Sequence, residues 1–546
     1  MKPADEVGDW QSPTRLQSKI LNFYAGSTML ARHLILLFAS LAINHVVSVA
    51  AENAEPTVSQ TIDRMLAESW EADSITATPP SDDAEFLRRA WLDLAGVAPP
   101  VWEVRSFLNN DHLNDDDPSD RRQKRIELID RLLQSPQHAV HMAARWTDAM
   151  LPSSSQTDPA QRPSVAALQE WLRLQFLANT PYDHLVGKFL TAGGAGDSGP
   201  AIFYTSNSLQ PEKLAAATSR IFMGIQIQCA QCHDHPMDRW TQEDFWAYAA
   251  FFSQLSSTDS GMNRQAILED RPGGEVHLPD TETIVAPRYP GVASKPERDP
   301  ADNRRRQLTI WLASQDNPYF ARAAVNRVWG HLFGQGIVDP VDAMDAANTP
   351  SHPRLLDYLA DQFTAHRFDL RWLYRTLAIT DAYGHTSRLG DDVPPPPSSF
   401  AAMPVKTLSA AQFYDSMAQN VFHRTDDAIV INRDQFLTRM SFPGSSPRDY
   451  PLGMIQILAL LNGDATTLAT DPNQSGLMAA VEAPFFDDST TVETVFMATV
   501  SRRPTETETA TFVKHLGESD SPNEKHQAIS DMVWVLINSA ESAMCP

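Results

Sequence analysis

Apolar residues recur every three or four positions through most of the chain beyond residue 57, the spacing of one face of an α-helix. One clear stripe consists of Phe86, Leu87, Ala90, Trp91 and Leu94. Gly96 and Pro99 follow it and favour its end. The same spacing returns from Arg304 to Leu377 and through most of the last 140 or so residues. The pattern therefore predicts a mainly α-helical protein.

Two stretches interrupt this pattern. Residues 265–300 are rich in Pro and Gly and contain strand-like runs at 275–278 and 283–286, which predict a small β-hairpin. Four prolines and two serines at 394–399 predict a stiff linker or surface loop. The chain accordingly divides into a helical domain over 57–254, a Pro/Gly-rich connector over 255–300 and a second helical domain over 301–545.

The N-terminal region has the pattern of an export signal. Arg32 precedes an apolar run over 34–43, and small residues follow at 48–51. We therefore expect residues 1–51 to be a leader and signal peptide, with Met29 as a candidate start of translation. The expected location is the periplasm or cell envelope, with no stable membrane span after cleavage.

The net charge and the number of cysteines limit the range of possible functions. The net charge of −24 argues against non-specific binding to nucleic acid or to anionic lipid. The chain has three cysteines, and two of them fall in Cys229-Ala-Gln-Cys-His233. So few cysteines do not form a disulfide framework. The adjacent pair therefore indicates a local chemical role.

The spacing C-x-x-C-H is that of a covalent attachment site for c-type haem. Two thiols one helical turn apart can each add to a vinyl group of one porphyrin, and the histidine that follows can reach the iron. Cys229 and Cys232 are then the thioether residues, and His233 is the proximal iron ligand. The apolar stripe Leu214, Ala217, Ile221 and Ile225 continues to both cysteines, which predicts that one helix presents both sulfurs.

The other iron ligand is not evident from the sequence. Met237 and His235 lie too close to His233 in the chain to reach the opposite haem face easily. More distant candidates are Met142, His141, His138 and His352. A five-coordinate iron is the remaining alternative.

The same residues allow other chemistry. Cys229, Cys232, His233 and His235 could bind zinc, although this spacing is tight for a tetrahedral site. The two cysteines could instead form a local disulfide, as an oxidising compartment favours. The protein would then be a non-redox binding or scaffold module. An accessory role in polysaccharide processing is a further alternative. No catalytic residues and no redox partner are evident, and the sequence assigns no reaction.

Two neighbouring patterns bear on this region and on the second domain. Pro236 is expected to end the cysteine helix, and Thr241 with Asp244 three residues later predicts the cap of the next helix. In the second domain, five polar or aromatic residues share one predicted helix: Arg322, Asn326, Arg327, Trp329 and His331. They could bind an anion, or they could be buried polar residues that fix two helices together.

Several longer segments resemble one protein family. The segment over 225–246, which contains the cysteine motif, is similar to the signature of planctomycete-specific cytochrome-like proteins. Further similar segments are those over 86–96, 121–136, 317–334, 350–353, 366–372, 500–504 and 533–539. Members pair an N-terminal PSCyt-type domain with a C-terminal PSD-type domain, both of unknown function. The resemblance implies export and cytochrome-like character, and it supplies no reaction.

Overall fold

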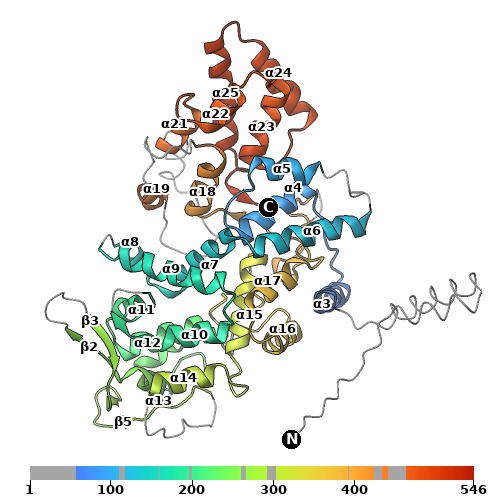
Figure 1. The fold of residues 1–546 in the computed structure, drawn as a ribbon. Helices are drawn as coiled ribbons and strands as arrows, with labels where there is room; N and C mark the ends of the chain where they lie inside the picture. The colour runs from blue at the N-terminus through green and yellow to red at the C-terminus, as the bar shows by residue number, and fades with distance from the viewer. Residues whose placement is uncertain are drawn as a thin grey trace, which may run out of the picture. The chain divides into compact units, whose positions relative to one another are not determined.

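Helices make up most of the structure, a computed structural model, as the apolar spacing predicts (Figure 1). The structure describes residues 57–109, 117–158, 160–195, 199–259, 266–291, 303–390, 393–422, 433–440, 461 and 463–546. The expected signal peptide over 1–51, with Met29, lies outside these residues. Within the described part of the chain, every helix is too short or too polar to cross a bilayer.

The helices of the first half carry the predicted stripes. They are α3 (Val58–Asp73), α4 (Asp83–Leu94), α5 (Val101–Leu108), α6 (Pro118–Leu133), α7 (Pro136–Met150), α8 (Ser153–Thr157), α9 (Arg162–Leu177), α10 (Tyr182–Leu190), α11 (Ala201–Ser206), α12 (Pro211–Thr218) and α13 (Gln242–Ala249). Short π and 3-10 turns also occur: η1 (Ser219–Met223), η2 (Ile227–Gln231) and η3 (Ala250–Phe252). Side chains of Asp82, Ser135 and Thr241 cap α4, α7 and α13 and satisfy free backbone N–H groups.

The second half continues with helices. They are α14 (Arg304–Leu312), α15 (Phe320–Phe333), α16 (Pro353–Ala365), α17 (Leu370–Ala378), α18 (Ala410–Asn420), α19 (Arg433–Met440), α21 (Asp464–Thr470), α22 (Gly476–Val481), α23 (Asp488–Val500), α24 (Glu506–Gly517) and α25 (Pro522–Ile537). The proline stretch ends in the 3-10 turn η4 (Pro397–Ser399).

The strands form small antiparallel sheets. β4 (Val276–His277) pairs with β5 (Ile284–Val285), which confirms the predicted hairpin. A three-stranded sheet of β1 (Gly194–Ala195), β3 (Ala266–Asp270) and β2 (Leu255–Asp259) was not expected from the sequence. β6 (Lys406–Thr407) pairs with β7 (Met544–Cys545) over a long sequence separation. The protein is thus mainly α with small β-hairpins.

Buried apolar side chains form two clusters. The first takes side chains from both helical halves of the sequence, from Ile62 to Met403 together with Met497. The second is built mainly from α18 to α25. Residues 58–546 form one compact unit, and α23 packs against α5 (Figure 1). Helix α4 serves both clusters, because Leu94 belongs to the first and Leu92 to the second.

Candidate functional site

The chain before the cysteines does not form the single helix that the apolar stripe predicts. Helix α12 ends at Thr218 and widens into the π turn η1, and Gly224 then adopts a left-handed conformation with φ of 68°. A Cβ at Gly224 would lie 3.2 Å from Sδ of Met344, so a larger residue would be strained and crowded there. The backbone therefore turns at Gly224, and Cys229 lies in the separate 3-10 turn η2.

We call residues 229–233 the cysteine segment. Its backbone is held by buried neighbours and by hydrogen bonds, whereas its thiols and its imidazole are exposed. Ile227 and Ala230 are buried, whereas both cysteines and His233 are exposed. The side-chain amide of Gln242 donates to the carbonyl of Cys232 at 2.9 Å. The indole N–H of Trp246 donates to the carbonyl of Gln231 at 3.0 Å. Helix α13 thus holds the backbone of the segment and leaves its sulfurs accessible.

The start of α13 has the predicted cap. The side chain of Thr241 accepts from the backbone N–H of Asp244, and the Asp244 carboxylate accepts from the backbone N–H of Thr241. Asp234 reinforces the connection, because its carboxylate accepts from the backbone N–H of Gln242 at 2.9 Å. Hydrogen bonds therefore hold both ends of the short loop between the cysteine segment and α13.

The three expected haem-binding side chains are available for chemistry. Cys229 and Cys232 are free and exposed, with no disulfide between them. Nδ1 of His233 lies 2.7 Å from the carbonyl oxygen of Asp234. An Nδ1–H donated to this carbonyl leaves Nε2 free, the arrangement usual for a metal-binding histidine. The donor set of two thiols and one oriented imidazole therefore fits a c-type haem.

His235, the fourth residue of the zinc alternative, has other contacts. Its ring Nδ1 accepts from the backbone N–H of Met237 at 3.2 Å. The backbone N–H of His235 donates to the carbonyl of Trp240. Among the described residues, no group of three or more His, Cys, Asp or Glu side chains is arranged to hold a metal ion.

The four distant candidates for a second iron ligand have contacts elsewhere in the fold. Met142 is buried in the first apolar cluster, and Nδ1 of His138 lies 2.7 Å from the carbonyl oxygen of Leu94. The rings of His141 and His331 lie 5.6 Å apart, and those of His352 and Phe400 lie 5.5 Å apart. None of these contacts involves the cysteine segment.

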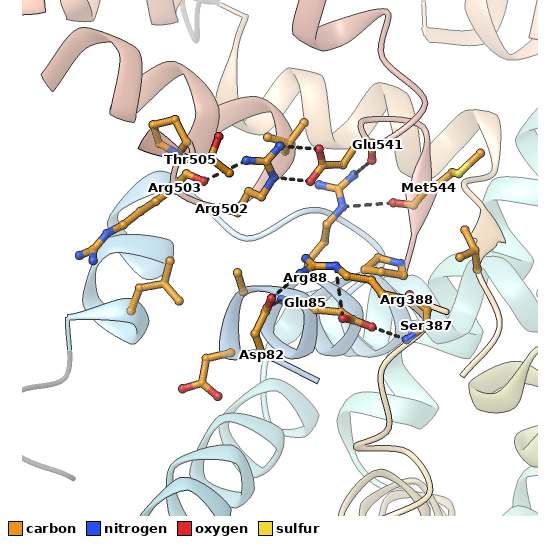
Figure 2. A pocket seen from close by; sticks show the side chains of 17 residues that line it. Asp82, Glu85, Arg88, Ser387, Arg388, Arg502, Arg503, Thr505, Glu541 and Met544 are labelled. Atoms are coloured by element: carbon orange, nitrogen blue, oxygen red, sulfur yellow. Dashed lines mark hydrogen bonds and ion pairs between the residues drawn. The ribbon is translucent and has the colours of Figure 1, made fainter. Parts of the chain in front are cut away.

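A pocket of about 700 Å³ lies between α4 and the C-terminal helices (Figure 2). Its arginines are bonded to the protein. Arg88 donates to the Ser501 hydroxyl and to the carbonyls of Glu541, Ser542 and Met544. The remaining arginines of the pocket are paired with carboxylates: Arg388 with Asp82, Arg502 with Glu508 and Glu541, and Arg503 with Glu493. Hydrogen bonds from Arg502 lower the pKa of Glu508 to about 2. These contacts join α4 to the C-terminal helices.

A second set of buried polar groups lies between the two apolar clusters, and we call Asp93, Tyr383, Lys406 and Cys545 the polar junction. Lys406 Nζ is 2.5 Å from one Asp93 carboxylate oxygen, and the Tyr383 hydroxyl donates to the other at 2.9 Å. Lys406 also donates to the carbonyl of Leu332. Cys545 lies opposite Lys406 in the β6–β7 pair, and burial raises the pKa of its thiol to about 12. This thiol is protonated and inert at neutral pH.

No sequence motif marks the polar junction. Its members lie far apart in the chain, and each is a common residue without a motif. One signal was present: Arg88, Arg89 and Asp93 interrupt a stretch that is otherwise apolar on every side. In the structure α4 is buried on nearly all faces, which gives each of these charges a buried partner.

Two family models match the chain. PSCyt2, described as a protein of unknown function (DUF1549), matches residues 61–257, and PSD1, described as a protein of unknown function (DUF1553), matches residues 304–426. No curated protein and no solved structure gives a match. The arrangement of an N-terminal and a C-terminal family domain, which the resemblance implied, is confirmed.

Proposed function

We propose that this chain, which belongs to the family that combines a PSCyt2 and a PSD1 domain, carries a covalently attached haem c on its cysteine segment. Cys229 and Cys232 would form the thioether bonds, each by adding S and H across one vinyl group. His233 would be the axial ligand through Nε2. The proposed role is electron transfer or redox sensing in the cell envelope, with a partner still to be identified.

The observation that carries this proposal is the state of His233. Its Nδ1 lies against the carbonyl of Asp234, so the ring orientation and tautomer are set before any ligand binds. The two thiols beside it are free and exposed. Helix α13 supports the backbone between them through Gln242 and Trp246. These contacts support the proposal, because attachment requires two free thiols and one oriented histidine on a short segment.

When bound, the haem would supply a one-electron iron couple whose potential depends on ligation, hydrogen bonding and solvent exposure. The residues of this chain contribute to each of these factors. The Asp234 carbonyl would orient the His233 ring through its contact with Nδ1. The exposed position of the cysteine segment gives a redox partner direct access.

The test is a visible spectrum of protein made in an exporting host that attaches haem to such motifs. We expect a Soret band that stays with the polypeptide after denaturation. Replacing both Cys229 and Cys232 by Ser should remove the band. The matched control Cys545→Ser should retain it, because Cys545 is buried at the polar junction. A colourless wild-type protein from that host would contradict the proposal.

A further inference from the structure

A cavity of about 330 Å³ adjoins the polar junction, apart from the cysteine segment. Parts of the chain that are far apart in sequence line it: α4 and α7 from the PSCyt2 match, α15 and β6 from the PSD1 match, and β7 near the C-terminus. A volume near the lower end of the usual range for ligand pockets suits a small metabolite.

The side chains that line this cavity carry a net positive charge. Its cations are Arg145, Arg327 and Lys406, and its carboxylates are Asp93 and Asp339. Lys406 is fully engaged by Asp93 and by backbone carbonyls, so these two charges compensate each other. Arg145 and Arg327 remain against Asp339, which is exposed at the rim.

Within the described part of the chain, neither arginine has all of its N–H donors bonded. Among the described residues, Arg145 has no hydrogen-bond or ion-pair partner. Arg327 donates to the carbonyl of Ile221 at 3.3 Å and lies 3.7 Å from Asp342, a carboxylate that already pairs with Arg220 at 2.8 Å. Nε of Arg327 is buried without an acceptor. Leaving a buried donor unpaired is costly, and an anion in the cavity would remove that cost.

The histidines nearby respond to this positive charge. Burial lowers the pKa of both His141 and His331 well below the ordinary value, and the charge of Arg145 lowers it further. His331 lines the cavity, and its Nδ1 lies 3.0 Å from the Tyr374 hydroxyl. The cavity wall therefore combines two guanidinium groups, a neutral imidazole and the hydroxyl of Thr407.

We propose that this cavity binds a small oxyanion, a carboxylate or a phosphate ester, between the guanidinium groups of Arg145 and Arg327. A guanidinium presents two parallel N–H donors that match the oxygens of either group. The hydroxyl of Thr407 and the ring of His331 offer hydrogen bonds to polar groups on the rest of the ligand. Because residues of both family domains line the cavity, binding would join the two domains through one ligand.

Titration calorimetry of the whole protein with D-gluconate and, separately, with inorganic phosphate tests this site. We expect saturable binding of at least one probe, and the probe that binds more tightly identifies the head group as carboxylate or phosphate. Arg145→Gln should weaken binding at least about tenfold, the loss of one charge-assisted hydrogen bond. Since Arg145 makes no hydrogen bond or ion pair with the described residues, and its charge acts on Asp148 only through space, this variant should keep the wild-type circular dichroism and melting temperature.

The matched control is Arg322→Gln. Arg322 lies on α15 with Arg327, but it pairs with Asp357 and lines a different cavity. This variant should bind the probe like the wild type. The Ser variant of Cys229 and Cys232 should also bind normally, which separates this site from the haem proposal. Binding of neither probe, or equal binding by Arg145→Gln and the wild type, would overturn the inference.

Discussion

The three cysteines of this chain occupy two opposite environments. Cys229 in a 3-10 turn and Cys232 at its end have exposed, free thiols, whereas Cys545 is buried in a β-pair 3.9 Å from Asp93. Desolvation, with the nearby carboxylate, makes the Cys545 thiol a weak acid and a packing residue. The comparison shows that the burial of each thiol by the surrounding fold determines its reactivity.

The same contrast separates the two regions as a whole. The cysteine segment is held by a few hydrogen bonds from α13 and two buried apolar side chains. The polar junction is held by a buried ion pair, a tyrosine and contacts from both apolar clusters. The first region is arranged for access and the second for joining distant parts of the chain.

The largest expected difference is in thiol reactivity. In haem-free protein, Cys229 and Cys232 should react with a maleimide at the rate of a free thiol. Cys545 should react at least about a thousandfold more slowly, because the core must open before it is exposed. Mass spectrometry of labelled peptides over time measures both rates. Rapid labelling of all three in folded protein would remove the contrast.

The next largest effect is on stability. Lys406→Met should lower the free energy of unfolding by about 3–5 kcal/mol, because Asp93 would be left as a buried, uncompensated charge. Urea denaturation measures this change. The control is Lys514→Met in the exposed pair with Glu518, which should cost less than about 1 kcal/mol. Similar costs for the two variants would show that the junction does not hold the fold.

The buried histidines predict an acid-sensitive fold. Burial lowers the pKa of His138 from its ordinary value of 6.5 to about 4, so the unfolded state binds a proton that the folded state does not. The contribution of His138 to the free energy of unfolding is complete above pH 6.5 and falls as the pH drops toward 4, by about 1.4 kcal/mol per pH unit. Asp63, whose pKa burial raises to about 6, acts in the opposite direction.

A variant isolates the histidine from the aspartate. In His138→Gln, the slope of unfolding free energy against pH between 4 and 6.5 should be smaller than in the wild type by about 1.4 kcal/mol per pH unit, the effect of one proton. Urea denaturation at several pH values measures the difference from wild type. His277→Gln on β4, an exposed position, is the matched control. An unchanged slope in His138→Gln would contradict the buried, neutral state of this ring.

The smallest effect concerns the support of the cysteine segment. Trp246→Phe keeps an aromatic side chain but removes the indole N–H that donates to the Gln231 carbonyl. The free energy of local opening should therefore fall by about 1 kcal/mol. Hydrogen exchange of residues 227–235 should accelerate, with little change in global stability. Trp102→Phe, at a side chain that is 65% exposed, is the control. Unchanged exchange in Trp246→Phe would show that α13 does not fix the segment.

Local features were predictable from the sequence, and long-range features were not. The cap of α13 depends on Thr241 and Asp244 alone, and it formed as predicted. Asn326 proved to be a buried polar residue that fixes structure, because its amide bonds the backbone of Val338 and Val341. Val338 and Val341 lie in the loop after α15, so Asn326 fixes this loop and does not join two helices as one interpretation expected.

The expected helix through both cysteines was wrong for a long-range reason. Gly224 has a left-handed backbone and packs against Met344, which no local pattern reveals. The polar junction was missed for the same reason, since Asp93 and Lys406 meet only through the tertiary fold. The motif identified the residues of the cysteine segment, while the fold determined that they lie on an exposed turn.

Haem attachment is tested most directly by the intact mass of native protein from a host that attaches haem to C-x-x-C-H motifs. We expect the mass of the chain plus one haem, with the added mass on the peptide that contains Cys229 and Cys232. The bare chain mass, or a loss of two hydrogens from a disulfide between these cysteines, would contradict it.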